Sequence, residues 1–232
     1  MSAFRHKLLL RGMLKKGLRV LAAKSVGPTV FALVLFSVGT LFGALGAASL
    51  PAGEREAAFQ QISTALVSYA STDTADRGGS VREELADAFL AHWKWIGVIA
   101  LAGLSVVGLP VAWFVVFLKG ALLGFTIVCL VSRGTADGWA ALAAVAPQQL
   151  IASTAVVLTC AASTAFAASV IRRRFSGEAI EGRRLARRTA RYAAVVTALT
   201  ALVFVAAAVE TFVSPALAER ALSIAGRLGT MD

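Results

Sequence analysis

The chain has 232 residues, of which 58% are hydrophobic and 16% are charged, and its mean hydropathy is +0.76. Soluble domains carry about 25% charged residues, so this composition excludes an ordinary soluble globular protein. The formal net charge of +10 is gathered in two segments of the chain.

Residues 1–27 are predicted to form a basic amphipathic helix on the cytoplasmic side. Residues 1–24 contain seven Lys or Arg and no acid, and over residues 5–21 the apolar and basic side chains separate onto opposite faces of a helix. Such a helix lies in the membrane interface. It is interpreted as an anchor that fixes orientation, with a regulatory or partner-binding helix as the alternative.

Five apolar blocks predict an all-α, polytopic integral membrane protein with about five transmembrane helices in a membrane domain of residues 28–213. The predicted spans are residues 28–50, 95–109, 111–132, 150–171 and 192–213. Most are long enough to cross a bilayer as one helix. The first block is longer than the ~7–15-residue apolar region of a cleaved signal peptide, so a retained anchor is expected.

Residues 95–132 contain 38 residues with a single charge, Lys119. As one helix they would reach ~57 Å, against a hydrocarbon core of ~30 Å. The chain is therefore predicted to turn at Gly108-Leu109-Pro110, because proline lacks an amide donor and disfavours helix at the residue before it. The first of the two resulting spans is short, so it is either deeply embedded or extended by its flanking residues.

Charge predicts the orientation of the chain. Residues 1–24 and 172–191 are strongly basic, whereas residues 51–91 carry seven acids and three arginines. The positive-inside rule places both basic segments in the cytoplasm, with the N-terminus inside and the C-terminus outside. The basic residues are interpreted as contacts with anionic membrane lipids, and no nucleic-acid binding is expected because no folded basic reading surface is available.

The outer segment, residues 51–91, is predicted to form two amphipathic helices. Its apolar residues recur at three- or four-residue spacing, with a polar, glycine-containing turn region between the two groups. These apolar stripes either pack on each other or on lipid, or they bind an extracytoplasmic partner. The candidate partner-binding residues are Phe59, Ile62, Leu66, Tyr69, Val81, Leu85 and Phe89. Residues 214–232 are predicted to form a short outer tail.

Four polar residues within the predicted membrane domain are candidates for structural or functional roles, because burying such groups in a membrane is costly. They are Lys119, Gln148, Gln149 and Glu210. Pro147-Gln148-Gln149 is predicted to break the helix and to leave residues 139–146 as a short lead-in or re-entrant piece. Structural roles are favoured over a transport site, which broken helices also build.

Glycines predict close helix packing as well as turns. Gly39 and Gly43 form one GxxxG motif, and Gly120 and Gly124 form another. Such motifs bring helix backbones together, but they do not show whether the partner helix belongs to the same chain. A homo-oligomer therefore remains open.

No catalytic group, metal site or cofactor is expected. The two histidines, His6 and His92, are predicted on opposite sides of the membrane, and the two cysteines, Cys129 and Cys160, are placed inside spans as small apolar residues. No nucleophile–base set or metal-binding motif is present in the sequence, so the chain is interpreted as not being an enzyme.

Several short motifs, in their order and spacing, resemble the stage II sporulation protein M family over nearly the whole chain. They are Gly108-Leu-Pro-Val111, Phe117-Leu-Lys-Gly120 with Gly124-Phe125-Thr126, Ala146-Pro-Gln-Gln149, and Val209-Glu-Thr-Phe-Val-Ser-Pro215. The family pattern at the third motif is closer to Leu-Pro-Gln-Asn, so Ala146 and Gln149 depart from it.

The resemblance implies a function that periodicity alone does not give. Family members form a complex with stage II sporulation proteins D and P, which cut peptidoglycan, thin the septal wall and drive engulfment of the forespore. The resemblance therefore implies a non-enzymatic scaffold in the bacterial cell membrane, in the mother-cell membrane at the sporulation septum. A small transporter or permease-like subunit is the alternative function, and an intramembrane enzyme ranks third.

Overall fold

The computed structural model describes residues 26–70, 81–105, 107–132, 136–175 and 182–212. All regular structure in these ranges is α-helical, which confirms the predicted fold class. The helices are α2 Val26–Ser49, α3 Ala52–Ala70, α4 Val81–Leu104, α5 Leu109–Val131, α6 Ala136–Phe175 and α7 Gly182–Phe212. The predicted helix at residues 1–27, apart from its last two residues, and the tail at residues 214–232 lie outside the described residues.

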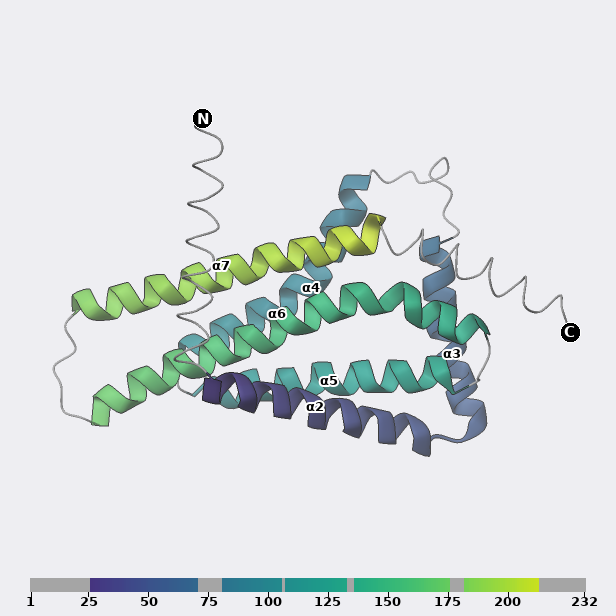
Figure 1. The fold of residues 1–232 in the computed structure, drawn as a ribbon, viewed down its shortest axis with the longest axis horizontal. Helices are drawn as coiled ribbons and strands as arrows, with labels where there is room; N and C mark the ends of the chain where they lie inside the picture. Colours follow the sequence, from purple (N-terminus) through teal and green to yellow (C-terminus); the bar gives the residue numbers. More distant parts are fainter. Residues whose placement is uncertain (1–25, 71–80, 106, 133–135, 176–181, 213–232) are drawn as a thin grey trace, which may run out of the picture.

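Five helices are long and apolar enough to cross a membrane, as predicted. The qualifying segments are Val26–Ser49, Leu85–Leu104, Leu109–Val131, Ala146–Arg172 and Ala186–Val209. These helices lie alongside one another with successive directions reversed, and α3 crosses one end of the bundle (Figure 1). The chain is therefore a multi-pass membrane protein.

The second membrane helix differs from the predicted span at residues 95–109. α4 runs without interruption from Val81 to Leu104, so the second amphipathic helix of the outer segment and the short apolar block are one helix. The reason is local, because the segment contains no proline and its two glycines, Gly97 and Gly103, are tolerated inside a helix. The short block is thus extended by the residues that precede it.

The predicted break at Pro147 is a bend inside a continuous helix. α6 continues through Pro147 and includes Gln148 and Gln149, so residues 139–146 are not a separate piece. A proline removes one amide donor and displaces the helix axis, while the alanine-rich sequence on both sides restarts regular hydrogen bonding. Figure 1 shows the N-terminal part of α6 turning away from the direction of the rest of the helix.

The basic segment at residues 172–191, predicted as a loop, is mostly helical. α6 continues to Phe175 and α7 begins at Gly182. Arginine is a good helix former, so the two membrane helices extend past the apolar blocks. Arg172, Arg187 and Arg191 are exposed on these extensions.

The core lies where α4, α5, α6 and α7 meet. Ile96, Ile99, Val116 and Val203 are almost completely buried there, and the α2 residue Ala32 joins the same cluster. The outward faces carry large exposed apolar side chains instead, which suits helices that contact lipid. Exposed examples on α2 are Leu33, Leu41, Phe42 and Leu45.

Candidate functional site

The two GxxxG motifs pack against each other within the chain. A Cβ atom added at Gly39 or Gly43 of α2 would overlap the backbone of Phe117 or Ala121 in α5. A Cβ atom at Gly120 or Gly124 of α5 would likewise overlap the backbone of α2. Both glycine faces are therefore filled by the other helix, and neither is open to a second copy of the chain.

We call this contact of Gly39 and Gly43 with Gly120 and Gly124 the α2–α5 seam. Two aromatic pairs lie beside it. Phe31 meets Trp113 edge-on at 5.0 Å between ring centroids, and Phe42 lies 5.7 Å from Phe117. Edge-on and tilted rings add to the contact made by their area alone. The seam thus combines backbone contact at its centre with ring contact along its length.

The Gly108–Pro110 turn connects α4 to α5 with almost no intervening chain. Gly108 is the N-cap residue of α5 and its N–H donates to the Ser105 carbonyl at 3.1 Å. A Cβ atom at Gly108 would lie 2.8 Å from the Ala102 carbonyl carbon, so a side chain has no room there. Pro110 occupies the first turn of α5, where a missing amide donor costs nothing.

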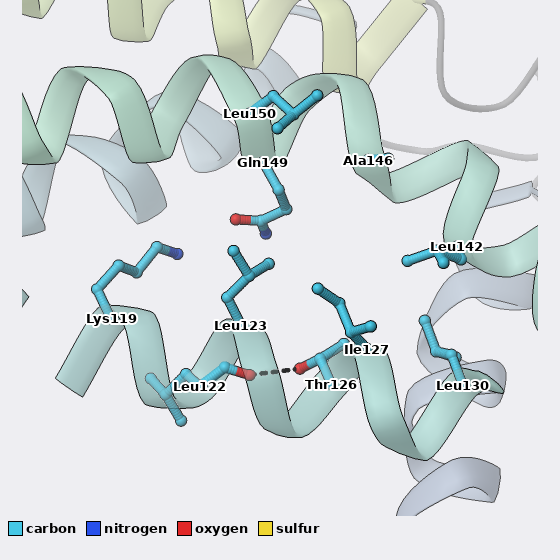
Figure 2. A pocket seen from close by; sticks show the side chains of 10 residues that line it. All are labelled: Lys119, Leu122, Leu123, Thr126, Ile127, Leu130, Leu142, Ala146, Gln149 and Leu150. Carbon is cyan, nitrogen blue, oxygen red and sulfur yellow. Dashed lines mark hydrogen bonds between the residues drawn. The ribbon is translucent and has the colours of Figure 1, made fainter. Parts of the chain in front are cut away.

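A pocket of about 300 Å³ lies between α5 and the bend in α6 (Figure 2). It exists because the bend at Pro147 carries the first turns of α6 away from α5. Its lining is mostly aliphatic, with the polar residues Lys119, Thr126 and Gln149 and no acid. The lining residues are Lys119, Leu122, Leu123, Thr126, Ile127, Leu130, Leu142, Ala146, Gln149 and Leu150.

Lys119 and Gln149 reach toward each other across this pocket from opposite helices (Figure 2). The Lys119 ammonium lies 5.5 Å from the centroid of the Trp95 ring on α4, a cation–π contact. The Gln149 Oε1 atom is buried and accepts no hydrogen bond from the described residues. Gln148 is buried as well, while the Glu210 side chain lies outside the described residues.

A polar joint connects α4, α6 and α7 at the end of the bundle that carries the arginines. The Tyr192 hydroxyl donates to the Ala100 carbonyl at 2.8 Å and shares a hydrogen bond of 2.9 Å with the Ser163 hydroxyl. Phe166 stacks on the Tyr192 ring at 4.9 Å. Gly103 leaves the space for this joint, because a Cβ atom there would overlap Ser163.

The sequence analysis did not predict this joint. Ser163 and Gly103 carry no motif, and each is a small residue in an apolar run. The only available signal was a tyrosine at the start of a span, since a tyrosine hydroxyl in a membrane requires a hydrogen-bond partner.

The candidate partner-binding residues fall into two groups. Phe59 is 5% exposed, and Phe89 is half-buried with its ring 6.0 Å from Phe204 of α7. Both rings therefore pack inside the fold, and Leu85 is half-buried. The side chains of Ile62, Leu66, Tyr69 and Val81 lie outside the described residues.

Arg55 fixes the angle between α2 and α3. Its guanidinium donates to the carbonyls of Ala48 at 3.0 Å and Leu50 at 2.9 Å, at the C-terminal end of α2. These carbonyls lack partners within the helix, and a cation there also matches the negative end of the helix dipole. On the exposed side of α3 lie Glu54, Ala57 and Gln61.

The described residues offer no group of three or more His, Cys, Asp or Glu side chains that could hold a metal ion. Cys129 and Cys160 are free thiols, and both are fully buried. Among the described residues, the candidate site consists of helix packing, hydrogen bonds and the cation of Lys119.

A family model described as Stage II sporulation protein M matches residues 32–215, from the first membrane helix to just beyond the last. The chain belongs to this family. The match covers the α2–α5 seam, the pocket and the outer segment alike. Membership of the family makes it a sporulation-related membrane protein. No curated protein and no solved structure matches the chain.

Proposed function

We propose that this protein is a non-enzymatic membrane scaffold for a peptidoglycan-degrading complex with the counterparts of stage II sporulation proteins D and P. The complex would thin the septal wall and drive engulfment of the forespore from the mother-cell membrane at the sporulation septum. Family membership supports a sporulation role, and the partners are those that the family resemblance implies. The scaffold needs a rigid surface on the side of the wall.

The observation that carries the proposal is the position of the outer segment. α3 and the start of α4 lie at one end of the bundle, and the end of α6 and the start of α7 lie at the other (Figure 1). These two helix ends carry the exposed residues Arg172, Arg187 and Arg191. The positive-inside rule supports a cytoplasmic location for the arginines and hence an outer location for α3. α4 continues from that outer segment directly into the bundle, so a partner bound there is held by the membrane domain.

Because Phe59 of the predicted apolar stripe is buried, we place the proposed partner contact on the exposed face of α3 instead. Phe59 fills the interior, whereas Glu54, Ala57 and Gln61 face outward. Protein interfaces that are not permanent have polar rims of this kind. We infer that this polar face contributes to binding.

Co-purification in detergent of the tagged protein with the host's protein D and P counterparts tests the proposal. Ala57→Arg/Gln61→Arg is expected to lose both partners, because two bulky cations replace small or neutral groups on the contact face. Ala186→Arg is the matched control, because Ala186 is exposed on the arginine-bearing end of α7. Failure of the wild-type protein to retain either partner would contradict the scaffold.

Cysteine labelling tests the proposed orientation separately. Gln60→Cys is expected to react with a membrane-impermeant maleimide on intact cells, and Arg187→Cys only after the membrane is opened. The native thiols of Cys129 and Cys160 are buried and give a low background. The reverse pattern would place α3 in the cytoplasm and remove the proposed contact with wall enzymes.

A small transporter or permease-like subunit is the second candidate, and one observation favours it. The bend at Pro147 and the pocket beside Lys119 resemble the bent helices and polar groups that line solute sites. A solute flux that Lys119→Ala abolishes while D and P remain bound would support transport over the scaffold role.

A further inference from the structure

The outward face of α4 carries two charged side chains. Asp87 and Lys94 are both exposed, and they are seven residues apart, which places them on the same side of the helix. Both lie in the segment Leu85–Leu104, which is long and apolar enough to cross a membrane. Charged residues in membrane helices usually face the interior of a bundle, because hydrocarbon does not solvate them. The surroundings of this face therefore differ from pure hydrocarbon.

Lys94 lies at mid-depth in the bundle. It is ten residues before the end of α4 at Leu104, a distance of ~15 Å. Its neighbour Trp95 has its ring 5.5 Å from the Lys119 ammonium of α5. Lys119 is ten residues into α5, so its Cα lies ~15 Å from one end of that helix and ~18 Å from the other. Both helices therefore place Lys94 far from either end of the bundle.

Helix α2 presents the opposite kind of surface at the same depth. Gly39 of α2 meets the backbone of Phe117 in α5, two residues from Lys119. Close to Gly39, the outward residues Leu41 and Phe42 are 60% and 65% exposed. α2 and α4 each pack on α5 and α6, and they form different parts of the outer surface (Figure 1). At mid-depth the bundle is thus apolar along α2 and charged along α4.

The apolar parts of these two faces differ in length. On α2 the exposed apolar residues run from Val26 to Leu45, about 28 Å, which is close to the ~30 Å of a hydrocarbon core. On α4 the uncharged stretch from Lys94 to Leu104 measures only about 15 Å. A bilayer of ordinary thickness therefore fits the face of α2 and is too thick for the face of α4.

The residues around Lys94 are those of a membrane boundary. Trp93 is 43% exposed beside it, and tryptophan is enriched where hydrocarbon meets headgroups. The charged residues Asp87, Glu84 and Glu83 follow toward the start of α4, and none follows toward its end. Side chains in a helix lean toward its N-terminus, which favours the same side for the Lys94 ammonium. Charges on one side only mark a boundary rather than an isolated contact with a buried partner helix.

We infer that the bilayer is thinned beside α4, so that phospholipid headgroups and water of the leaflet at the α3 end reach Lys94 and Asp87. A short apolar stretch is matched by local thinning and by lysine stems that extend toward the headgroups. Lys94 then meets headgroup phosphate, and Asp87 meets water. The bilayer keeps its full thickness along α2, so its thickness changes across the width of one chain. This inference goes beyond the proposed scaffold function and does not depend on it.

Spin labels on single added cysteines test the inference in the full chain, reconstituted alone in phosphatidylcholine–phosphatidylglycerol vesicles. Ala91→Cys lies three residues before Lys94 on the exposed side of α4, and Phe42→Cys is the matched position on α2. The native thiols Cys129 and Cys160 are buried. Relative accessibility to oxygen and to a water-soluble nickel complex gives the depth of each label. The Ala91 label is expected ~10 Å closer to the headgroups than the Phe42 label.

Two double variants test whether the charges set this depth. Asp87→Leu/Lys94→Leu makes the face apolar, and it is expected to move the Ala91 label ~10 Å into the hydrocarbon. Glu54→Leu/Arg187→Leu removes one charge of each sign from the two ends of the bundle, and it is expected to leave the label at its depth. All four substitutions are at exposed positions, so the fold is expected to persist.

Three results would overturn the inference. Equal depths of the Ala91 and Phe42 labels would mean a bilayer of uniform thickness around the chain. An Ala91 label hidden from both reagents would mean that protein covers α4, and spectral broadening between labels would identify that protein as a second copy of the chain. An Ala91 label that stays at headgroup depth in Asp87→Leu/Lys94→Leu would mean that the two charges do not thin the bilayer.

Discussion

Two of the neighbours of helix α5, α2 and α6, contact it on different faces and in opposite ways. Toward α2 it presents Gly120 and Gly124, and the two backbones touch. Toward α6 it presents Lys119, Leu123 and Ile127, and the bend in α6 leaves a pocket. In lipid there is no hydrophobic driving force between helices, so their association depends on close packing. The backbone contact between α2 and α5 therefore makes this pair permanent. The second pair leaves a pocket of about 300 Å³ beside Lys119.

Replacing a seam glycine is expected to have the largest effect on this comparison. Gly43→Ala places a methyl group 2.6 Å from the Ala121 carbonyl carbon, so α2 and α5 must separate. The free energy of unfolding is expected to fall by about 3 kcal/mol, measured by SDS titration in mixed micelles. Gly46→Ala is the control on the same helix, with open space around it and an expected gain of about 0.5–1 kcal/mol. Equal effects at both positions would refute the seam.

The polar joint tests whether α4, α6 and α7 also depend on a permanent contact. Tyr192→Phe removes the hydrogen bonds to Ala100 and Ser163 but keeps the ring on Phe166. An expected loss of about 1–2 kcal/mol follows from two hydrogen bonds in a membrane interior. The control is Thr154→Val, because the Thr154 hydroxyl donates to the Leu150 carbonyl of its own helix. This substitution should change the free energy of unfolding much less. An unchanged free energy of unfolding in Tyr192→Phe would mean that apolar packing alone holds these helices together.

Straightening α6 should convert the open contact into a closed one. Pro147→Ala restores an amide donor inside the helix and is expected to raise the free energy of unfolding by about 1 kcal/mol. Maleimide labelling of a Gln149→Cys variant should slow down in the Pro147→Ala background, because the first turns of α6 then approach α5. Unchanged labelling would show that the pocket does not depend on the proline.

The smallest effect is expected at the edge of the bundle. Arg55→Met removes the donors to the Ala48 and Leu50 carbonyls, with an expected loss of about 0.5–1 kcal/mol. Limited proteolysis should then cut between α2 and α3 faster than in the wild type. Arg187→Met, at the opposite end of the bundle, is the control. Equally fast cleavage between α2 and α3 in this variant would contradict a specific role of Arg55.

Much of the fold follows from the sequence, because bilayer thickness restricts the solutions. The five apolar blocks, the turn at Gly108 and Pro110, and the family relationship were all predicted from residue patterns. Helix ends were predicted less well. No helix-breaking residue lies between Val81 and Leu104, so α4 begins at Val81. The apolar content alone predicted a membrane helix that begins only at residue 95.

The candidate sites show where a single sequence stops being informative. Both GxxxG motifs can be recognised in the sequence. Their packing against each other could not be predicted, because α2 and α5 are far apart in the chain and only the fold makes them neighbours. Phe59 has helical spacing typical of an apolar contact face, yet burial, not spacing, decides whether its ring is available. The pocket required knowing that α6 bends at Pro147 without ending there.

The α2–α5 seam also has a consequence for genetics. When a larger residue meets another side chain, a second substitution that shortens the neighbour can restore the fit. At Gly39, Gly43, Gly120 and Gly124 the added atom meets a main-chain carbonyl, which no codon change can shorten. Suppressor screens at these four positions should therefore yield true reversion to glycine and no compensating residue across the contact.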